Sequence, residues 1–356
     1  MPLPQALADQ YDLGRLVGRG GTADVYDGVD RQTGRRVAIK VLSAEAARDP
    51  LLVSRFVREA EIARALDHPA IVAVLDSGEV PGTTAQPDEA GCDNETEQRT
   101  ETEQRDQAEQ SGDTEQSNST VRSDDTEQSD DTARYIVMEY VDGRTLRWIL
   151  RNGPVPIPTA LKIAHGVLAA LEHAHAAGVV HRDIKPGNVM IATTGQVKVM
   201  DFGTAWARGT TEPAQVVGTV QYMSPEHIRG EQVDPRSDLY SVGCLLFQLV
   251  TGRPPFVGDD QATVAAQQVT DPPPAPSTLN PYLPAALDRV LLAALAKDRA
   301  DRPQTATQMR AELRAMDPPR PSATSGDTAT VTGPRSAPTE EIALVPAGPT
   351  ETAPTD

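Results

Sequence analysis

The sequence is poor in cysteine, in aromatic residues and in long apolar runs. Cys92 and Cys244 are its only cysteines among 356 residues, and aromatic residues make up 4%. One cysteine stands in an acidic stretch and the other in an apolar run, which excludes a disulfide framework or a CxxC metal site and fits a reducing cytoplasm. The apolar runs fall short of the roughly 20 residues that span a bilayer, and the first residues do not resemble a signal peptide. We therefore expect a cytoplasmic protein without a membrane span.

Basic residues are also scarce relative to acidic ones, and the formal net charge is −18. This balance argues against nucleic acid or an anionic membrane as a partner, because both require a basic footprint. The excess is local: residues 85–133 hold sixteen acidic residues against three arginines, and residues 318–356 hold five against two. The remainder of the chain is close to neutral and is expected to be globular.

Two segments lack the apolar residues that a packed core requires. Residues 82–133 are rich in Glu, Gln, Asp, Thr and Ser, and a strand pattern resumes directly after them, so we interpret them as a disordered acidic insert within a sheet. Residues 317–356 are expected to form a disordered tail rich in Pro and Thr. The sequence Thr-Glu-Gln recurs at residues 96–98, 102–104, 114–116 and 126–128. Both segments are either flexible spacers or phosphorylated sites for phosphothreonine-reading domains.

The most informative stretch is 181–203, which reads His-Arg-Asp-Ile-Lys-Pro-Gly-Asn, a predicted hairpin, and Asp-Phe-Gly. Two short apolar segments separated by a glycine turn predict that hairpin, which would bring the polar groups before it close to the one after it. These groups are Asp183, Lys185, Asn188 and Asp201. Carboxylate and amide oxygens suit Mg²⁺, and an ammonium neutralises phosphoryl charge. A solvated loop is the alternative for any one of them, but a poor account of all four in this order.

The N-terminal part predicts a small antiparallel sheet with a Gly-rich turn. Three strands are expected within residues 13–42, and the turn 18–22 allows backbone N–H groups to approach phosphates closely. No Gly-Lys-Ser/Thr ending follows, so the turn is not a P-loop. Lys40 continues an apolar strand, and Glu59 lies on the predicted helix 50–66, from which it could pair with Lys40. Taken singly, an edge-strand lysine and a solvated glutamate remain the alternatives.

In this order the motifs resemble the protein-kinase signature set: a Gly-rich hairpin, Val-Ala-Ile-Lys, a helix Glu, His-Arg-Asp, Asp-Phe-Gly and Ser-Pro-Glu. Segments such as His-Pro-Ala-Ile-Val resemble the Hanks-type, eukaryotic-like serine/threonine kinases of bacteria, especially the actinobacterial branch. The resemblance covers residues 11–316 apart from the insert. It implies an α+β, bilobal fold, with a small antiparallel-sheet N-lobe that contains one key helix (11–141) and a mainly helical C-lobe (142–316). Residues 1–10 would form a lead.

The resemblance also implies a site for ATP and Mg²⁺ or Mn²⁺. Lys40, oriented by Glu59, would hold the α- and β-phosphates, while Asn188 and Asp201 would ligate the metal. Met138 would be the gatekeeper at the start of the hinge. The residues expected around the nucleotide are Val17, Gly18, Arg19, Gly20, Gly21, Val25, Ala38, Met138, Glu139, Val141 and Met190.

On the acceptor side, the resemblance implies that Asp183 accepts the proton of the substrate hydroxyl and that Lys185 stabilises the transferring phosphoryl group. Thr219 would bridge these two residues. Lys185 favours serine or threonine acceptors in protein substrates over tyrosine. A pseudokinase scaffold that binds nucleotide or partners without catalysis is the alternative, disfavoured because the charged residues of the site are all present.

Further residues match supporting and regulatory positions of the family. Glu226 and Arg302 resemble the pair that anchors the end of the activation segment, and Asp238 resembles the residue that supports the catalytic loop. Arg182 precedes the catalytic Asp, and kinases with this arginine are commonly activated by phosphorylation of the activation loop. The candidate acceptors for autophosphorylation are Thr210 and Thr211, with Thr204 less favoured. The sequence neither shows nor excludes activation through a transient homodimer, which is common in this family.

Overall fold

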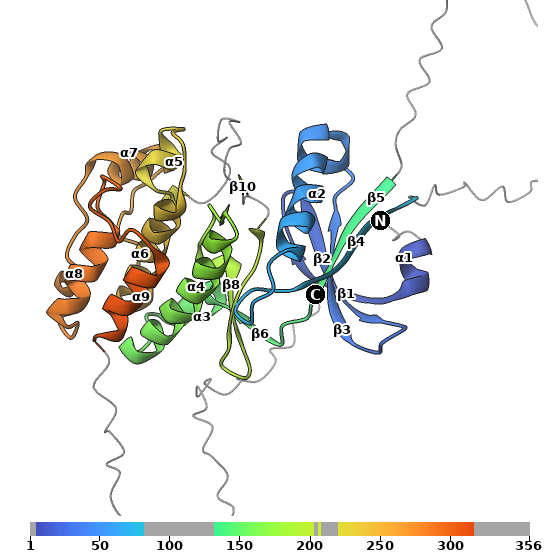
Figure 1. Cartoon of the computed structure of the whole chain (residues 1–356), viewed down its shortest axis with the longest axis horizontal. Helices are drawn as coiled ribbons and strands as arrows, with labels where there is room; N and C mark the ends of the chain where they lie inside the picture. The colour runs from blue at the N-terminus through green and yellow to red at the C-terminus, as the bar shows by residue number, and fades with distance from the viewer. Residues whose placement is uncertain (1–4, 82–131, 203–205, 208–219, 317–356) are drawn as a thin grey trace, which may run out of the picture.

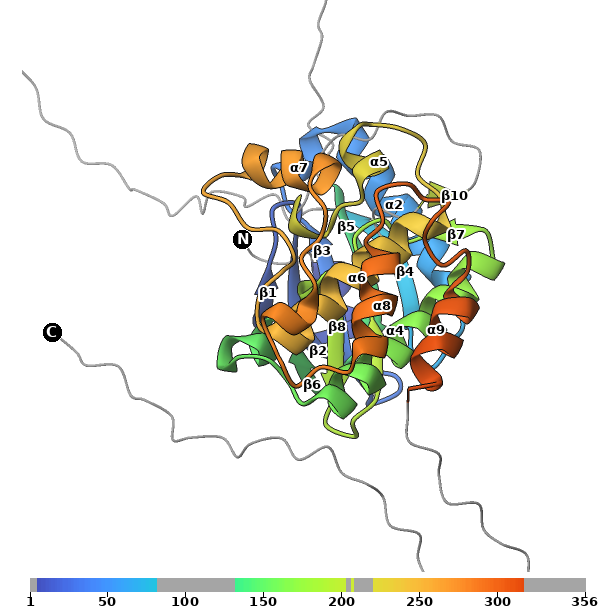
Figure 2. The ribbon, with the colours of Figure 1, turned by 90° about the vertical axis from the view of Figure 1, so that its left-hand side faces the viewer.

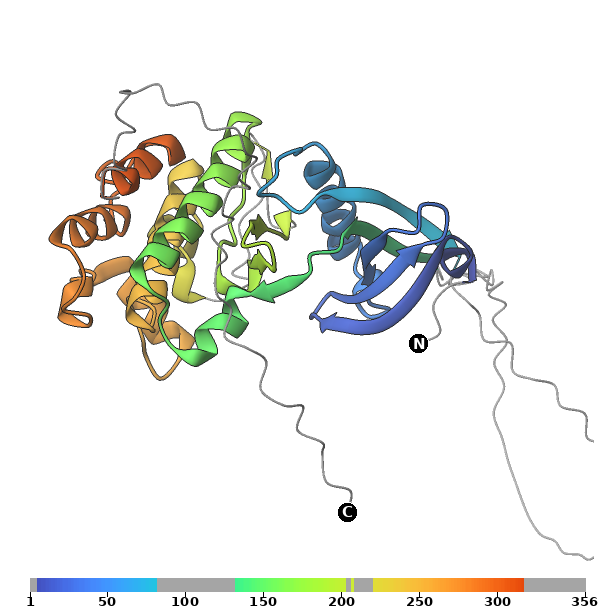
Figure 3. The ribbon, with the colours of Figure 1, turned by 90° about the horizontal axis from the view of Figure 1, so that it is seen from below.

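The structure is a computed structural model of the chain, and it describes residues 5–81, 132–202, 206–207 and 220–316. Figure 1 shows a twisted sheet with helix α2 beside it, next to a larger group of helices. Strand β5 (Thr132–Glu139) leads from the first part toward the second, and a view from below separates the two parts (Figure 3). The predicted α+β architecture, with a sheet-containing N-lobe and a mainly helical C-lobe, is confirmed.

An antiparallel five-stranded sheet forms the N-lobe. Its strands are β1 (Tyr11–Arg19), β2 (Ala23–Asp30), β3 (Arg36–Leu42), β4 (Val74–Pro81) and β5, in the spatial order β1-β2-β3-β5-β4. Gly34 closes the turn between β2 and β3 with φ of 70°, a left-handed conformation that favours glycine. Its N–H donates to the carbonyl oxygen of Asp30 at 2.8 Å, which ties the two strand ends together.

Each face of this sheet buries its own apolar cluster. The helices that cover the two faces are α1 (Gln5–Gln10) and α2 (Pro50–Arg64), with the short turn η1 (Ala46–Arg48) before α2. Helix α2 begins where the Asp49 side chain accepts a hydrogen bond from the N–H of Leu51. Its Phe56 and Ala60 join a cluster with Met138, while Leu7 of α1 is buried in the cluster on the opposite face.

The C-lobe is built around two long helices. Its helices are α3 (Leu146–Ile149), α4 (Ile157–Ala176), α5 (Pro225–Ile228), α6 (Pro235–Thr251), α7 (Gln261–Thr270), α8 (Ala285–Ala294) and α9 (Ala306–Arg314). Figure 2 views the molecule from the C-lobe side, with α8 and α9 in front. Short turns are η2 (Leu150–Asn152), η3 (Pro186–Asn188), η5 (Val220–Tyr222) and η6 (Pro276–Thr278). Helix α6 is apolar and buried on nearly all sides, because α4 and α8 contact it. Gly252 ends it in a left-handed conformation with φ of 86°.

Small strands of the C-lobe carry the functional loops. They are β6 (Gly143–Thr145), β7 (Val179–Val180), β8 (Val189–Ala192), β9 (Val197–Val199) and β10 (Trp206–Ala207). Strands β8 and β9 form the predicted antiparallel hairpin, in which Val189 is opposite Val199, and β6 pairs with the other edge of β8. Strand β10 pairs with β7. Among the described residues, no helix is both long and apolar enough to cross a membrane.

Several elements differ from the sequence-based expectations. Helix α1 lies in the expected lead, and at six residues it is held by the burial of Leu7 rather than by its own propensity. The apolar run Ile71–Leu75 predicts a strand that begins at Ile71, but β4 begins at Val74, and Ile71 instead bridges Val199 of the C-lobe. Strand β5 begins at Thr132, two residues inside the expected insert. Helix α7 was not predicted; Asp260 caps its N-terminus.

Candidate active site

The register of the N-lobe sheet brings the expected nucleotide residues together. Gly18 of β1 is opposite Val25 of β2, and Val25 is in turn opposite Lys40 of β3. On the other side of β3, Ala38 is opposite Met138 of β5. Val141 also packs against the cluster that contains Met138. The glycine turn, the apolar side chains and the lysine thus share one region of the sheet.

Gly20 closes the Gly-rich turn, where only a glycine fits. Its N–H donates to the carbonyl oxygen of Ala23 at 3.0 Å, and a Cβ at this position would lie 2.9 Å from that same oxygen. Arg19 and Val17, expected near the nucleotide, are exposed, and Arg19 lies 3.8 Å from Asp24 across the turn. The turn therefore keeps its backbone close-packed while its long side chains face solvent.

Lys40 joins the two lobes through two carboxylates. Its Nζ donates to Oε1 of Glu59 at 2.6 Å, which confirms the predicted pair, and to Oδ1 of Asp201 at 3.2 Å. Burial would lower the pKa of Lys40, but Asp201 and Glu59 together raise it, so the ammonium stays charged. Burial would likewise raise the pKa of Asp201, and the ammonium lowers it instead. Burial raises the pKa of Glu59 against the opposing effect of Lys40.

The catalytic loop holds its polar groups around Asp183. Lys185 Nζ donates to Oδ2 of Asp183 at 2.6 Å, and the Asn188 amide nitrogen donates to the same oxygen at 2.9 Å. The Asn188 nitrogen also donates to the Asp183 carbonyl oxygen at 2.9 Å. Two donors thus converge on one carboxylate oxygen. The Met200 N–H donates to the carbonyl oxygen of Asn188 at 3.0 Å, which brings Asp201 alongside this loop.

Asp238 of helix α6 holds the start of the catalytic loop through two backbone hydrogen bonds. Its side chain is fully buried and accepts hydrogen bonds from the N–H of His181 at 2.9 Å and of Arg182 at 2.8 Å. The His175 ring nitrogen lies 2.8 Å from the same carboxylate. Burial alone would raise the pKa of Asp238, but these contacts lower it. The predicted support is confirmed; the sequence contains no signal for the part played by His175.

Two strained backbone positions lie beside the polar groups around Asp183. In the described part of the chain, Arg182 and Asp201 are the non-glycine residues with positive φ, at 69° and 61°. Such strain is kept where the surroundings over-determine it, most often at active sites. Here the His181 ring connects the two segments: its Nδ1 accepts from the Asp183 N–H at 3.2 Å, and its Nε2 donates to the carbonyl oxygen of Met200, the residue before Asp201, at 3.1 Å.

The donor set next to this loop fits a divalent cation. Because the Asn188 nitrogen is used by Asp183, the amide oxygen is the atom left for a ligand, and it accepts no hydrogen bond from the described residues. Asp201 has a second carboxylate oxygen beyond the one that Lys40 occupies. No group of three or more His, Cys, Asp or Glu within the described ranges could form a protein-only cage. Mg²⁺ needs none, because one or two protein oxygens and substrate phosphates suffice.

Comparison with known proteins settles the family. A model of the protein kinase domain matches residues 11–85 and 93–313. The chain belongs to the protein kinase family. The fold is also that of the solved Mycobacterium tuberculosis PknI kinase domain, with a TM-score of 0.58 and 26% identity over 86% of this chain and 96% of that one.

Curated relatives show to which group of protein kinases the chain is similar. The chain is 45% identical over 321 residues to a probable serine/threonine-protein kinase of Streptomyces coelicolor, covering 88% of this chain and 41% of the relative. It is 43% identical over 319 residues to the serine/threonine-protein kinase PknB of Mycobacterium tuberculosis, covering 88% and 44%. These relatives place it among the Hanks-type bacterial kinases, a family that uses ATP and a divalent metal. The chain spans less than half the length of these relatives.

The end of the kinase activation segment is anchored by a buried ion pair. Arg302 Nη1 and Nη2 donate to Glu226 Oε1 and Oε2 at 2.7 and 2.8 Å, and both side chains are almost fully buried. Burial would raise the pKa of Glu226, but the guanidinium and the Ser237 hydroxyl lower it to about 2. The predicted pair is confirmed as a contact, and its two parallel bonds fix its geometry.

One interlobe contact was missed by the sequence analysis. Lys198 of β9 forms an ion pair with Glu139 at the end of β5, and the Ala73 N–H donates to the same Glu139 oxygen at 3.0 Å. Lys198 also donates to the Ile71 carbonyl at 3.4 Å. This connects the hinge, the loop before β4 and the strand that leads to Asp201. The expected role of Glu139 in the hinge gave no indication of it.

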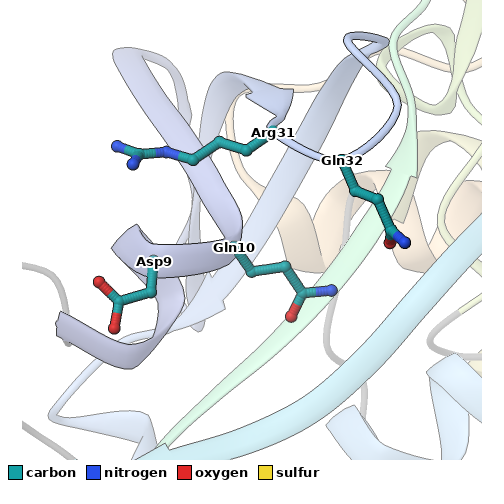
Figure 4. A pocket seen from close by; sticks show the side chains of 4 residues that line it. All are labelled: Asp9, Gln10, Arg31 and Gln32. Atoms are coloured by element: carbon teal, nitrogen blue, oxygen red, sulfur yellow. The ribbon is translucent and has the colours of Figure 1, made fainter.

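Other expected residues lie outside this arrangement. Thr204, Thr210, Thr211 and Thr219 fall outside the described residues. Gly21 lies in the Gly-rich turn and Met190 lies on β8. A Cβ at Gly21 would have no heavy atom within 4 Å, so its surroundings give no evidence for a ligand. A shallow hollow between α1 and the β2–β3 turn is lined by Asp9, Gln10, Arg31 and Gln32 (Figure 4), none of which is an expected site residue.

Proposed function

We propose that this chain is a serine/threonine protein kinase that transfers the γ-phosphoryl group of ATP to serine and threonine residues of protein substrates. The observation that carries the proposal is the link from Lys40 to both Glu59 and Asp201. It connects a sheet residue, a helix residue and a C-lobe residue 161 positions away, beside the carboxylate–lysine–amide group around Asp183. This arrangement suits phosphoryl transfer, in which positioning and charge neutralisation supply most of the catalysis.

On the nucleotide side, the N-lobe residues bind and orient ATP. The backbone of the turn around Gly18 and Gly20 would cover the phosphates, with Val17, Arg19 and Gly21 at its rim. The apolar side chains of Val25, Ala38, Val141 and Met190 would enclose the base, with Met138 and Glu139 at the hinge. Lys40 would hold the α- and β-phosphates, and its bond to Glu59 keeps the ammonium in place.

On the acceptor side, Asp183 would take the proton of the hydroxyl as the oxygen attacks phosphorus. The bonds from Lys185 and Asn188 to one Asp183 oxygen leave the other oxygen for that proton. Lys185 would stabilise the negative charge of the transferring group, and Thr219 would bridge Lys185 and Asp183. Asn188 and Asp201 would hold Mg²⁺ or Mn²⁺, which when bound neutralises the charge of the phosphates.

The decisive test uses the purified chain with γ-labelled ATP, Mg²⁺ and an acceptor protein. We expect label on the acceptor, and a loss of about 10²- to 10⁴-fold in Asp183→Asn, because the general base is removed. Nucleotide binding should persist in this variant. A wild-type chain that binds ATP yet labels nothing above the level of Asp183→Asn would establish a scaffold instead.

Regulation by phosphorylation fits the surroundings of Arg182. Burial lowers the pKa of this guanidinium; Asp238 opposes the shift and the nearby charge of Arg58 adds to it. A phosphate close to both arginines would relieve that repulsion. We propose Thr210 or Thr211 as the autophosphorylated residue. Mass spectrometry after incubation with ATP and Mg²⁺ should find phosphate on the peptide 204–219, and an unmodified peptide would refute the assignment.

A further inference from the structure

A basic surface borders the catalytic loop and has no part in the transfer described above. It consists of Arg144 on β6, Arg147 on α3 and Arg151 on η2, here called the α3 arginines. All three are exposed, and in the part of the chain that the structure describes none of them forms an ion pair. Arg144 lies over the Trp148 ring, 5.0 Å from its centroid. Their charges are therefore available to a ligand.

Arg147 lies directly against the catalytic loop. A Cβ built on Gly187 would be 2.9 Å from Nη2 of Arg147 and 3.3 Å from its guanidinium carbon. Gly187 stands in η3, between Lys185 and Asn188, the two residues that donate to Asp183. Only a residue without a side chain lets the guanidinium approach the loop this closely. The guanidinium thus meets the loop at Gly187, which is four residues after the proposed base Asp183.

Arg147 also lies near the end of the activation segment. Burial raises the pKa of the Tyr222 hydroxyl, and the charge of Arg147 acts against that shift, as a nearby cation does. Tyr222 belongs to η5, two residues before the Ser224 of the Ser-Pro-Glu sequence. The guanidinium therefore lies against the catalytic loop at Gly187 and close enough to Tyr222 for its charge to act there.

An acceptor whose hydroxyl reaches Asp183 would place its neighbouring residues within reach of this surface, because Arg147 lies against the loop that holds Asp183. An extended chain advances about 3.3 Å per residue, so the three or four residues beside the acceptor lie within roughly 10–13 Å of it. Arginine binds carboxylates through paired charge-assisted hydrogen bonds, and like charges there would be repelled. Acidic residues next to the acceptor fit the α3 arginines, and basic ones do not.

The chain itself contains acceptors of this kind. Thr-Glu-Gln occurs four times within residues 96–128, and Thr126 follows Asp124 and Asp125 directly. The strongly acidic charge of residues 85–133 is opposite in sign to the α3 arginines. No other stretch of comparable length in the sequence combines so many threonines with so many carboxylates.

We propose that the α3 arginines select acceptors flanked by acidic residues, and that the Thr-Glu-Gln repeats of a second copy of this chain are such acceptors. The inference rests on the proposed kinase function. The threonine oxygen bonds to the γ-phosphorus, Asp183 takes its proton, and the bond to ADP breaks. The α3 arginines hold the neighbouring carboxylates and take no part in the chemical step.

The first experiment compares two versions of the peptide 121–132, both with Ala in place of Ser123, Ser129 and Thr132, so that Thr126 is the only acceptor. One keeps its carboxylates, and the other has Asn and Gln in their place. With the wild-type chain we expect kcat/KM to favour the acidic peptide by roughly tenfold, and less at high salt because exposed charges are screened. Arg144→Gln combined with Arg147→Gln should bring the ratio of the two values close to one. Arg289→Gln, which removes an exposed arginine on the distant helix α8, should leave the ratio unchanged.

A charge swap separates recognition from a merely structural role. Arg147→Glu should prefer a peptide with lysines in place of the acids, a reversal that a damaged fold cannot produce. In the full chain, wild-type enzyme mixed with the Asp183→Asn chain as substrate should place phosphate on the Thr-Glu-Gln threonines of that substrate, and about tenfold less when the enzyme carries Arg144→Gln and Arg147→Gln. Phosphate confined to other sites would overturn the assignment of the repeats.

Two results would overturn the selection itself: equal kcat/KM values of the wild type for both peptides, or an unchanged ratio in the double variant. Failure of the proposed function would look different, because then neither peptide is labelled. In that case anisotropy of the fluorescein-labelled acidic peptide reads the contact without transfer. Weaker binding to the double variant than to Arg289→Gln supports the site, and equal binding refutes it.

Discussion

Two cation–carboxylate pairs of similar length lie in different surroundings in this protein. Lys40 is 2.6 Å from Glu59 at the junction of the lobes, and Arg302 is 2.7 and 2.8 Å from Glu226 within the C-lobe. Arg302 also donates to the carbonyl oxygens of Ala296, Lys297 and Arg236, so its guanidinium is fully used by the protein. Lys40 gives hydrogen bonds only to Glu59 and Asp201 among the described residues and keeps a donor for a ligand. We interpret the Arg302 pair, whose donors are all used within the protein, as a contact that stabilises the fold, and the Lys40 pair as part of the proposed ATP site.

The largest expected effect is on activity. Lys40→Met should lower kcat/KM for ATP by about 10²- to 10³-fold, because one preorganised charge at the phosphates is lost. The free energy of unfolding should fall by only about 1–2 kcal/mol, since the buried Glu59 can bind a proton when the ammonium is absent. Steady-state kinetics and urea unfolding of the same preparation test both values. If the Lys40→Met chain loses activity only because much of it is unfolded, the two pairs do not differ in the way described.

For the pair of Arg302 and Glu226 we expect the larger effect on the free energy of unfolding. Arg302→Met should destabilise the fold by about 3–5 kcal/mol, because Glu226 is left as a buried charge without its partner. Arg310→Met is the matched control: its pair with Glu172 is partly exposed, with 28% and 40% of the two side chains accessible, so it should cost less than about 1 kcal/mol. Urea denaturation measures both. Adding Glu226→Leu to Arg302→Met should recover part of the loss, and a further loss would contradict this account.

The pH dependence of stability should identify Glu226. Its pKa in the folded protein is about 2, below the ordinary 4.5, so the stabilisation is complete above pH 4.5 and is lost as the pH falls from there toward 2. The shift corresponds to roughly 3 kcal/mol. Urea midpoints at pH 6, 4 and 3 should fall more steeply for the wild type than for Glu226→Gln. Parallel curves would show that other carboxylates cause the acid sensitivity.

The smallest effect concerns the interlobe contact. Lys198→Met should cost about 1–2 kcal/mol, because Glu139 keeps its bond to the Ala73 N–H but loses its cation. The variant should also change KM for ATP while kcat changes less, since the hinge and the strand before Asp201 are no longer tied. Kinetics at varied ATP, compared with Glu139→Gln, tests this. A change confined to kcat would show that the contact acts on the chemical step instead.

The family, the two-lobed architecture and the polar residues of the candidate site could all be predicted from the sequence. Each motif is local, so residue type and spacing are enough to recognise it, as with the loop 181–188 and the hairpin after it. The pairs Lys40–Glu59 and Glu226–Arg302 were also predictable, because the motifs that contain their members have a constant order along the chain.

Which polar groups share a hydrogen-bond partner could not be predicted from the sequence and became known from the folded structure. The use of Asp201 by Lys40, of Asp238 by His175, and of Glu139 by Lys198 depends on how the lobes and helices pack. Distances of this kind are set by side-chain reach between elements far apart in sequence, which neither propensity nor spacing encodes. The approach of Arg147 to Gly187 belongs to the same class. The chemical type of each site residue could be predicted from its motif, whereas the contacts between these residues depend on how the backbone folds.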